Sequence, residues 1–221
     1  VKVKAFGLPY QVTLSSALGG EGAFYFVATL PDTGAELWKT DGTAAGTFMV
    51  KELMPGAAGA QVTTVLYDAP WLYFMATSPT TGRELWRTDG TAAGTTLLRD
   101  IHNDQPTARP LGLVTANGHL FFAAPTATQG RELWQSDGTT AGTSLLRDVV
   151  PGPDSGFGDG TPNSTVNGFS VAGERMFCLS SNGQLIRSDG TPEGTSVLKE
   201  PFYLPRNVGT EISMQPWGDA M

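Results

Sequence analysis

The stretch at residues 82–101, GRELWRTDGTAAGTTLLRDI, decides the fold because it is repeated along the chain. Nearly the same letters fill residues 34–53 (GAELWKTDGTAAGTFMVKEL) and 130–149 (GRELWQSDGTTAGTSLLRDV), and a degenerate copy fills residues 183–200 (GQLIRSDGTPEGTSVLKE). A catalytic site needs one copy of its residues, whereas a building unit of a repeat protein is copied along the chain. The repetition therefore indicates that the motif is mainly a structural unit of the fold and not a catalytic site.

Each copy belongs to a unit that divides at turn signals into four short runs. In residues 110–149 the runs are LGLVT, HLFFAA, RELWQS and TSLLRDV, separated by ANG, PTATQG and DGTTAG. Short runs rich in β-branched, aromatic or leucine side chains and bounded by Gly, Asn, Asp or Pro are typical of β-strands. Asn-Gly is in addition a hairpin signal. Each unit is therefore expected to form four antiparallel strands.

The second run of each unit is apolar throughout and does not alternate with polar residues. A strand with one face in water alternates, whereas a continuously apolar strand is buried on both faces. Four-stranded sheets that are covered on both faces by their neighbours are blades of a β-propeller. The four second runs are AFYFVAT, WLYFMAT, HLFFAAP and RMFCLSS.

The sequence predicts an all-β fold, a β-propeller built of four-stranded antiparallel blades of about 48 residues. Residues 1–221 are expected to form a single propeller domain or a fragment of a propeller. The two ends, VKVKAF at 1–6 and TEISMQPWGDAM at 210–221, resemble a fourth and a first strand and are predicted as partial blades. The four complete blades are predicted at residues 11–53, 61–101, 110–149 and 166–201.

Composition excludes several classes of function. The net charge is −7 without a basic stripe, which argues against nucleic acid as a partner. No apolar run approaches the roughly 20 residues of a membrane helix, so membrane insertion is not expected. One cysteine and two histidines leave little material for a disulfide or a zinc site, and no cofactor is predicted.

The DGT part of the repeat is predicted to be a structural turn. An Asp side chain can accept a hydrogen bond from the backbone N–H two residues on, and the following Gly permits a positive φ. The competing interpretation is a calcium loop, but one Asp per repeat makes a poor site for a hard cation. The residues in question are Asp41, Asp89, Asp137 and Asp189, with Gly42, Gly90, Gly138 and Gly190.

The tryptophans of the repeat, Trp38, Trp86 and Trp134, have two interpretations. They could wedge between blades, or they could line exposed pockets that stack on sugar rings, with Arg83 and Arg131 as further ligand-binding candidates. Ile186 in the fourth copy favours packing, because an aliphatic side chain keeps the burial but has no stacking face. The glutamates of the repeat, Glu36, Glu84 and Glu132, are expected to bond to backbone or to basic neighbours such as these arginines.

No catalytic constellation is found in the sequence, and no enzyme activity is predicted. There is no Gly-x-Ser-x-Gly elbow, phosphate loop or His-Glu-x-x-His motif. Asp154 and Asp159, in a glycine-rich insertion, are weak metal candidates, and the alternative is a flexible loop.

The sequence resembles a bacterial tandem-repeat family named for its Glu-Leu-Trp-x-x-Asp-Gly-Thr signature. The resemblance rests on ELWKTDGT at Glu36, ELWRTDGT at Glu84, ELWQSDGT at Glu132 and the decayed QLIRSDGT at Gln184. It implies a secreted or surface protein of a Gram-negative bacterium and no particular reaction. The DGTxxGT segment is also similar to the Asp-box turn of sialidases and other propellers.

Together these observations predict a non-catalytic, secreted or surface β-propeller that acts as a binding or scaffold module, with a glycan or another surface protein as partner. One alternative is a carbohydrate-binding lectin with a site on each blade. Another is a structural subunit that polymerises through incomplete terminal blades, and a third is a glycan-acting hydrolase.

Overall fold

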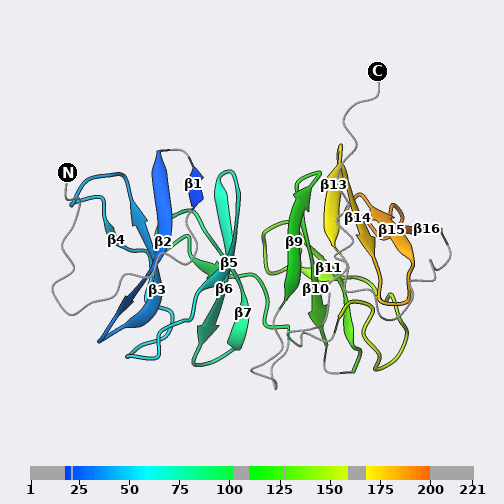
Figure 1. The fold of residues 1–221 in the computed structure, drawn as a ribbon, viewed down its shortest axis with the longest axis horizontal. Coiled ribbons are helices and arrows are strands. Elements are labelled where there is room, and N and C mark those ends of the chain that lie inside the picture. The colour runs from blue at the N-terminus through cyan, green and yellow to red at the C-terminus, as the bar shows by residue number, and fades with distance from the viewer. Residues whose placement is uncertain (1–17, 21, 102–109, 127, 159–167, 200–221) are drawn as a thin grey trace, which may run out of the picture. The chain divides into compact units, whose positions relative to one another are not determined.

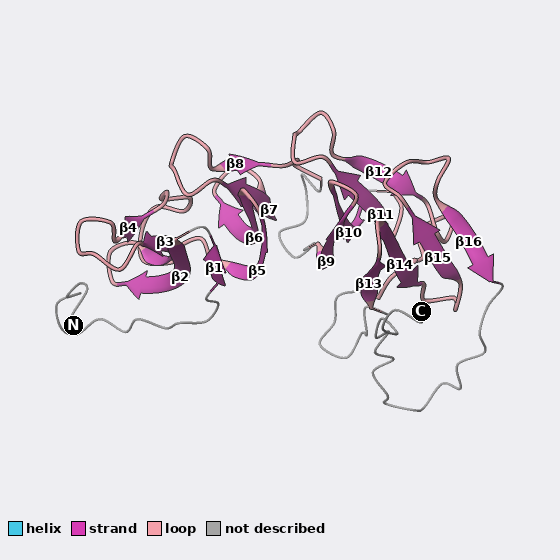
Figure 2. Cartoon of the chain, turned by 90° about the horizontal axis from the view of Figure 1, so that it is seen from above, coloured by secondary structure: helices cyan, strands magenta, loops and turns pink. Residues whose placement is uncertain are grey.

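The computed structural model describes residues 18–20, 22–101, 110–126, 128–158 and 168–199, and in these residues it contains strands and no helix (Figures 1 and 2). The strands form four separate four-stranded antiparallel sheets. The chain divides into two compact units, Val1–Thr107 and Ala108–Met221, each with two sheets. The partial strands predicted at residues 1–6 and 210–221 lie outside the described residues, and the single domain stays a prediction.

Each sheet takes its four strands from one repeat, in sequence order, so the predicted fold class of four-stranded propeller blades is confirmed. The sixteen strands found in the described residues lie within the predicted blade limits. Blade 1 consists of β1 (Leu18–Gly20), β2 (Ala23–Leu30), β3 (Gly34–Thr40) and β4 (Phe48–Met49), and blade 2 of β5 (Thr63–Asp68), β6 (Trp71–Ser78), β7 (Gly82–Thr88) and β8 (Thr96–Leu97). Blade 3 consists of β9 (Leu111–Ala116), β10 (His119–Pro125), β11 (Arg131–Ser136) and β12 (Ser144–Arg147), and blade 4 of β13 (Phe169–Ala172), β14 (Arg175–Leu179), β15 (Leu185–Ser188) and β16 (Ser196–Lys199).

The second and third strands pair in the same register in every blade. The Trp of the repeat, or Ile186 in blade 4, lies opposite the same position of the second strand each time. The hairpin predicted at Asn-Gly in blade 3 is present, with positive φ at Asn117 (51°) and Gly118 (72°). The equivalent cross-strand pairs are Phe26–Trp38, Phe74–Trp86, Phe122–Trp134 and Cys178–Ile186.

The fourth strands are shorter than the sequence predicts, since runs such as TSLLRDV contain seven residues. In blades 1 and 2, β4 and β8 contain only two residues each. In blades 3 and 4 the pairing of the third and fourth strands shifts register, between Leu133 and Trp134 and between Leu185 and Ile186. Beyond the two-residue strands the bonding continues outside the regular ladder, from Val50 N to Leu37 O at 2.9 Å and from Leu98 N to Leu85 O at 3.0 Å.

Each blade has two apolar faces, because successive side chains of a strand point to opposite sides of the sheet. We call the side that carries Trp38, Trp86, Trp134 or Ile186 the tryptophan face. We call the opposite side, which carries the Leu next to it in sequence, the leucine face. In β2, β6 and β10 the central residues are buried consecutively, as the continuous apolar runs predicted.

Within each unit, the leucine face of the first blade packs on the tryptophan face of the second. In the N-terminal unit one core cluster joins Tyr25, Val27 and Leu37 of blade 1 to Phe74 and Trp86 of blade 2. In the C-terminal unit the equivalent cluster joins the leucine face of blade 3 to the tryptophan face of blade 4. Its members include Phe121, Leu133, Leu146, Met176, Cys178 and Ile186.

A polar bond accompanies both apolar contacts. Lys51 Nζ of blade 1 donates to the carbonyl of Thr95 in blade 2 at 2.9 Å, and Arg147 Nη1 of blade 3 donates to the carbonyl of Thr195 in blade 4 at 3.4 Å. Arg147 ends the fourth strand of its blade and Lys51 lies two residues after the fourth strand of its own, and the acceptor in both cases is the last Thr of DGTxxGT. The same face pairing is therefore used in both units.

We expect Trp86→Ala to lower the free energy of unfolding by roughly 3–5 kcal/mol, because the indole ring lies in the contact between two blades. Trp86→Ile should cost less, since Ile186 fills the equivalent place in blade 4 and is fully buried. Denaturant titration followed by circular dichroism measures both values. Equal midpoints for Trp86→Ala and the unmodified chain would show that the ring does not support the blade contact.

Candidate functional site

The aspartate of the repeat closes its turn in all four blades. In blade 1, Asp41 Oδ1 accepts hydrogen bonds from Thr43 N at 2.8 Å and from the Thr43 hydroxyl at 2.7 Å. The Gly that follows each Asp has a positive φ, between 87° and 100°. The predicted turn bond is thus present in each copy. The other three pairs are Asp89 with Thr91, Asp137 with Thr139, and Asp189 with Thr191.

A relay of hydroxyl groups ties the same turn to the strands on either side. In blade 1, Gly42 N donates to Thr40 Oγ1 at 3.1 Å, and the Thr47 hydroxyl donates to the carbonyl of Thr43 at 2.5 Å. Thr40 and Thr47 are joined at 2.6 Å. Because Thr47 has already used its proton, Thr40 must be the donor between them. The sequence prediction missed this relay, which recurs through Thr88 and Thr95, Ser136 and Thr143, and Ser188 and Thr195.

The second glycine of the turn makes room for the aspartate. A Cβ on Gly46 would lie within 3 Å of the Asp41 carboxylate, and Gly94, Gly142 and Gly194 stand in the same relation to their own aspartates. The sequence interpretation gave this glycine only the task of returning the chain to the fourth strand. The structure shows why this position is a glycine, since the carboxylate approaches too closely to leave room for a Cβ.

The hydrogen bonds keep the turn aspartates ionised. The pKa of Asp41, Asp89 and Asp137 is lowered chiefly by the bond from the Thr hydroxyl, and that of Asp189 chiefly by the bond from Thr191 N. This contribution to stability is present above the usual Asp pKa and is lost as the pH falls through the lowered value. The charge therefore serves to hold the turn.

The glutamate of the repeat binds the connection between two blades. Glu36 is fully buried, and its carboxylate accepts hydrogen bonds from the backbone N–H groups of Leu53, Met54 and Ala60 at 3.4, 3.1 and 3.0 Å. These three residues belong to the connection from blade 1 to blade 2. The sequence analysis allowed backbone groups or basic side chains as partners of this glutamate, and the structure shows backbone N–H groups in blade 1.

The same arrangement is found in blade 3. Glu132 accepts from the N–H groups of Val149, Val150 and Gly156 at 2.6, 3.3 and 3.0 Å, and it is fully buried as well. In blade 2, Glu84 Oε1 accepts from Ile101 N at 3.3 Å, just before residues outside the described part of the chain. The Glu of each complete motif therefore holds the chain where it leaves its blade.

The two arginine candidates also bind backbone. Arg83 Nη1 donates to the carbonyl of Gln61 at 3.0 Å, and Arg83 Nη2 donates to the Thr63 hydroxyl. Arg131 Nε donates to the carbonyl of Gly158 at 2.9 Å. These bonds give both side chains a role in the fold, and their proposed ligand-binding role stays a prediction.

The three tryptophans are largely buried, with 6–9% of their surface exposed. Trp134 Nε1 donates to the carbonyl of Ala124 at 3.1 Å, and its ring stacks on Phe122 with 6.3 Å between the centroids. Trp86 lies in the contact between blades 1 and 2. This burial favours the packing interpretation, while sugar stacking stays a prediction.

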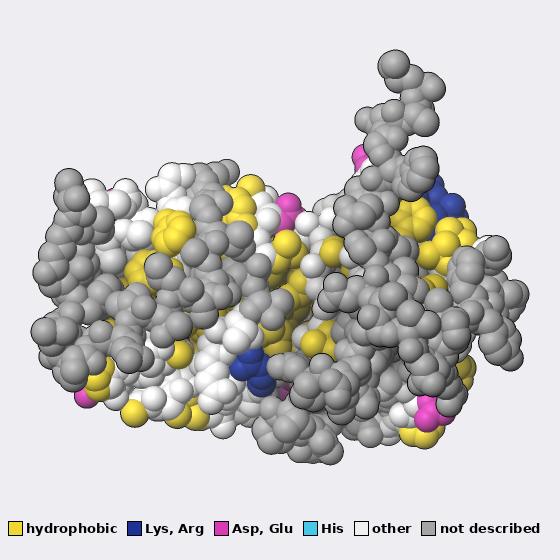
Figure 3. Space-filling model, viewed as in Figure 1, with side chains coloured by type: hydrophobic (Ala, Val, Ile, Leu, Met, Phe, Trp, Pro, Cys, Tyr) yellow, Lys and Arg dark blue, Asp and Glu magenta, His cyan; other side chains and the backbone are white. Residues whose placement is uncertain are grey.

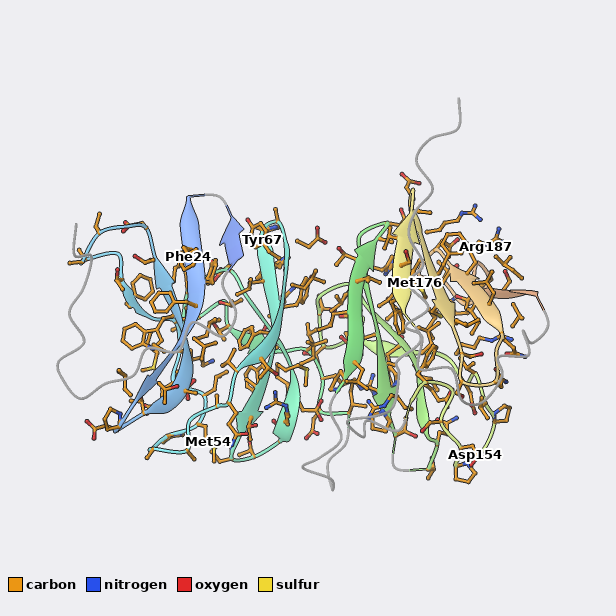
Figure 4. The ribbon with its side chains drawn as sticks, viewed as in Figure 1. Phe24, Met54, Tyr67, Asp154, Met176 and Arg187 are labelled. Carbon is orange, nitrogen blue, oxygen red and sulfur yellow. The ribbon has the colours of Figure 1, made fainter. Side chains whose placement is uncertain are left out.

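Of the two metal candidates, the structure describes only Asp154. Asp154 is exposed, as Figure 4 shows at the edge of the C-terminal unit, and Asp159 lies outside the described residues. Among the described residues, no three His, Cys, Asp or Glu side chains are grouped to hold a metal ion. Cys178 is buried among apolar side chains, which raises its pKa and keeps it as a thiol. The described residues also contain no helix that could cross a membrane.

Comparisons with known proteins show the fold. No protein-family model and no curated protein sequence matches the chain. Among solved structures, a Mycobacterium tuberculosis puromycin-hydrolysing peptidase matches 84% of this chain with a TM-score of 0.50 and 15% identity. The matched part is 28% of that peptidase, so the chain spans less than a third of its length. At this identity the likeness shows the fold alone.

Two further structures match more loosely. TolB from Acinetobacter baumannii matches 76% of this chain and 39% of its own length, with a TM-score of 0.45 and 13% identity. The computationally designed protein Ika4 matches 81% of this chain and 92% of its own length, with a TM-score of 0.44 and 14% identity.

We expect Gly94→Ala to lower the free energy of unfolding by about 1–3 kcal/mol, because the new Cβ would collide with the Asp89 carboxylate. Asp89→Ala removes that carboxylate together with its two bonds from Thr91. The double variant should therefore lose less stability than the sum of the single variants. A double-mutant cycle in denaturant measures the difference, and additive losses would contradict the role given to the glycine.

Burial raises the pKa of Glu36 from 4.5 to about 7, against the opposing effect of its backbone donors. Between these values the folded chain holds a proton that the unfolded chain has released. The contribution of Glu36 to stability therefore falls as the pH rises from 4.5 to about 7 and is constant above. We expect Glu36→Gln to make the measured fall of unfolding free energy over this range shallower.

Glu52→Gln is the matched control for this pH series. Glu52 is exposed and raises the pKa of Glu36 only as a minor, charge-based contribution. Most of the slope should remain in this variant. A slope that is the same in Glu36→Gln as in the unmodified chain would mean that the carboxyl titrates as it does in the unfolded chain.

Proposed function

We propose that this chain is a non-catalytic β-propeller repeat protein that acts as a binding or scaffold module. The observation that carries the proposal is the use of the repeated motif in the fold itself. In blade 1 the motif Asp closes a turn and the motif Glu holds a connection, and both act through backbone groups. Side chains engaged in this way are not available to bind or convert a substrate.

The setting proposed for this module is the outside of a Gram-negative cell. Its support is the resemblance to the bacterial family with the Glu-Leu-Trp-x-x-Asp-Gly-Thr signature, together with the acidic net charge of −7. A protein with this charge would meet another surface protein or a glycan more readily than nucleic acid. These partners remain part of the proposal.

The second candidate is a lectin with an equivalent site on each blade. One observation favours it, which is the repetition of an aromatic residue next to basic residues, as in Arg83 and Trp86. Against it stands the burial of the tryptophan rings, because a sugar stacks on an aromatic face that it can reach. The scaffold proposal is therefore preferred.

A glycan array with the unmodified chain and Trp86→Ile separates the two candidates. Trp86→Ile keeps an apolar side chain in the blade contact, as Ile186 does in blade 4, but removes the aromatic face. The scaffold proposal expects the same array profile from both proteins. Circular dichroism and the unfolding midpoint serve as controls for the fold.

The lectin interpretation expects a different outcome from the same array. Glycan binding by the unmodified chain that disappears in a folded Trp86→Ile variant would overturn the scaffold proposal. It would also place the sugar against the tryptophan position itself.

A further inference from the structure

A polar pair joins the third and fourth strands in blades 2, 3 and 4. The residue after the Trp of the motif, or after Ile186 in blade 4, lies opposite a Thr or Ser of the fourth strand. In each case the third-strand side chain donates a hydrogen bond to that hydroxyl group. The pairs are Arg87 with Thr96 at 3.4 Å, Gln135 with Ser144 at 3.2 Å, and Arg187 with Ser196 at 3.5 Å.

Blade 1 lacks this pair. The fourth-strand position is Phe48, which lies opposite Lys39 in the ladder and has no hydroxyl group to accept a bond. Phe48 is 41% exposed and belongs to β4, the edge strand of its sheet. Blade 1 therefore places an exposed aromatic ring where the other three blades have a bonded hydroxyl.

The Lys39 side chain turns to the neighbouring blade instead. Its Nζ lies over the ring of Tyr25, 5.6 Å from the centroid, and the side chain lies against Gly90 of blade 2. No hydrogen bond from this ammonium to another residue is found in the part of the chain that the structure describes. Because an ammonium only donates hydrogen bonds, Lys39 can serve a ligand that lies on Phe48 and carries acceptor oxygens.

Two carboxylates near Lys39 select against an acidic ligand. The pKa of Asp41 and that of Asp89 are lowered chiefly by the bonds from Thr43 and Thr91, and the charge of Lys39 adds a smaller lowering to both. A ligand with a negative charge would meet one attracting and two repelling charges. A neutral ligand meets no such penalty.

The wider surface has the same character. On the side seen in Figure 3, the described surface of the N-terminal unit consists mainly of hydrophobic and uncharged groups. Such a surface suits a neutral partner better than a charged one.

We propose that Phe48 and Lys39 form a binding site for a neutral carbohydrate. A hexose ring has an apolar C–H face that can stack on the phenyl ring, and hydroxyl oxygens that can accept bonds from the ammonium. Directly opposed residues of an antiparallel pair have Cβ atoms about 4.5–5.5 Å apart, so both side chains can reach one sugar ring. The inference rests on the proposed binding module and names the class of its ligand.

This site differs from a lectin site that is repeated on each blade. It lies at the edge of blade 1 and uses no motif tryptophan, and blades 2, 3 and 4 have Thr96, Ser144 and Ser196 in place of the phenylalanine. One carbohydrate site in the N-terminal unit is therefore expected.

Isothermal titration calorimetry with neutral tetrasaccharides of glucose, galactose and mannose tests the proposal. We expect the unmodified chain to bind at least one of them. Phe48→Ser introduces the residue found in blades 3 and 4 and removes the ring, so it should raise the dissociation constant at least about tenfold. Lys39→Met keeps a long side chain without the donor and should weaken binding as well.

Two variants serve as matched controls. Phe24 is a 38% exposed phenylalanine of the same blade, but it lies opposite Thr40 on the tryptophan face, so Phe24→Ser should bind as the unmodified chain does. Phe48→Tyr keeps the aromatic ring and should retain binding. Circular dichroism and the unfolding midpoint show whether each variant is folded.

The proposal is wrong if the unmodified chain binds none of the three sugars at millimolar concentration. It is also wrong if folded Phe48→Ser binds as tightly as the unmodified chain, or if an oligogalacturonate binds more tightly than the neutral sugars. Self-association that is lost in Phe48→Ser, without any sugar binding, would assign the ring to a second copy and equally contradict the site.

The array comparison of Trp86→Ile with the unmodified chain decides the proposed function separately. Both of those proteins contain Phe48, so the carbohydrate site predicts the same profile for the two. A chain that binds no sugar would remove this site and leave the scaffold proposal standing.

Discussion

A single blade of this protein cannot bury both of its apolar faces by itself. The second strand of each blade is apolar on both sides, and a strand sends successive side chains to opposite faces. In both units one such face is covered by a neighbouring blade, as where the leucine face of blade 1, with Leu37, packs on the tryptophan face of blade 2, with Trp86. The hydrogen bonds from Glu36 to the connection between blades 1 and 2 help to position blade 2 against blade 1.

The motif divides this task between local and longer-range bonds. The turn from Thr40 to Thr47 closes through its own hydroxyl, carboxylate and backbone groups, so it forms in the same way in every copy. Glu36 acts over a longer distance, because its carboxylate binds residues that lie between two blades. The first set of bonds shapes a blade, and the second sets where the chain goes next.

This division has a consequence for function. Asp, Glu and Trp often act in catalysis or ligand binding. In this motif they instead make hydrogen bonds to the backbone and apolar contacts. Recognition by such a protein would depend on surfaces outside the motif.

The sequence by itself determined the four blades, their strands and the turn at Asp41, because these depend on periodicity and on bonds between near neighbours. It could not determine the partner of Glu36 or the reason for Gly46. Glu36 meets Ala60 N, 24 residues further along the chain, only when the chain is folded. In the same way, the Asp41 carboxylate comes to lie against Gly46 only in the folded turn. The sequence also left two interpretations of the tryptophans, and tertiary structure favours packing because only it shows which face of a blade another blade covers.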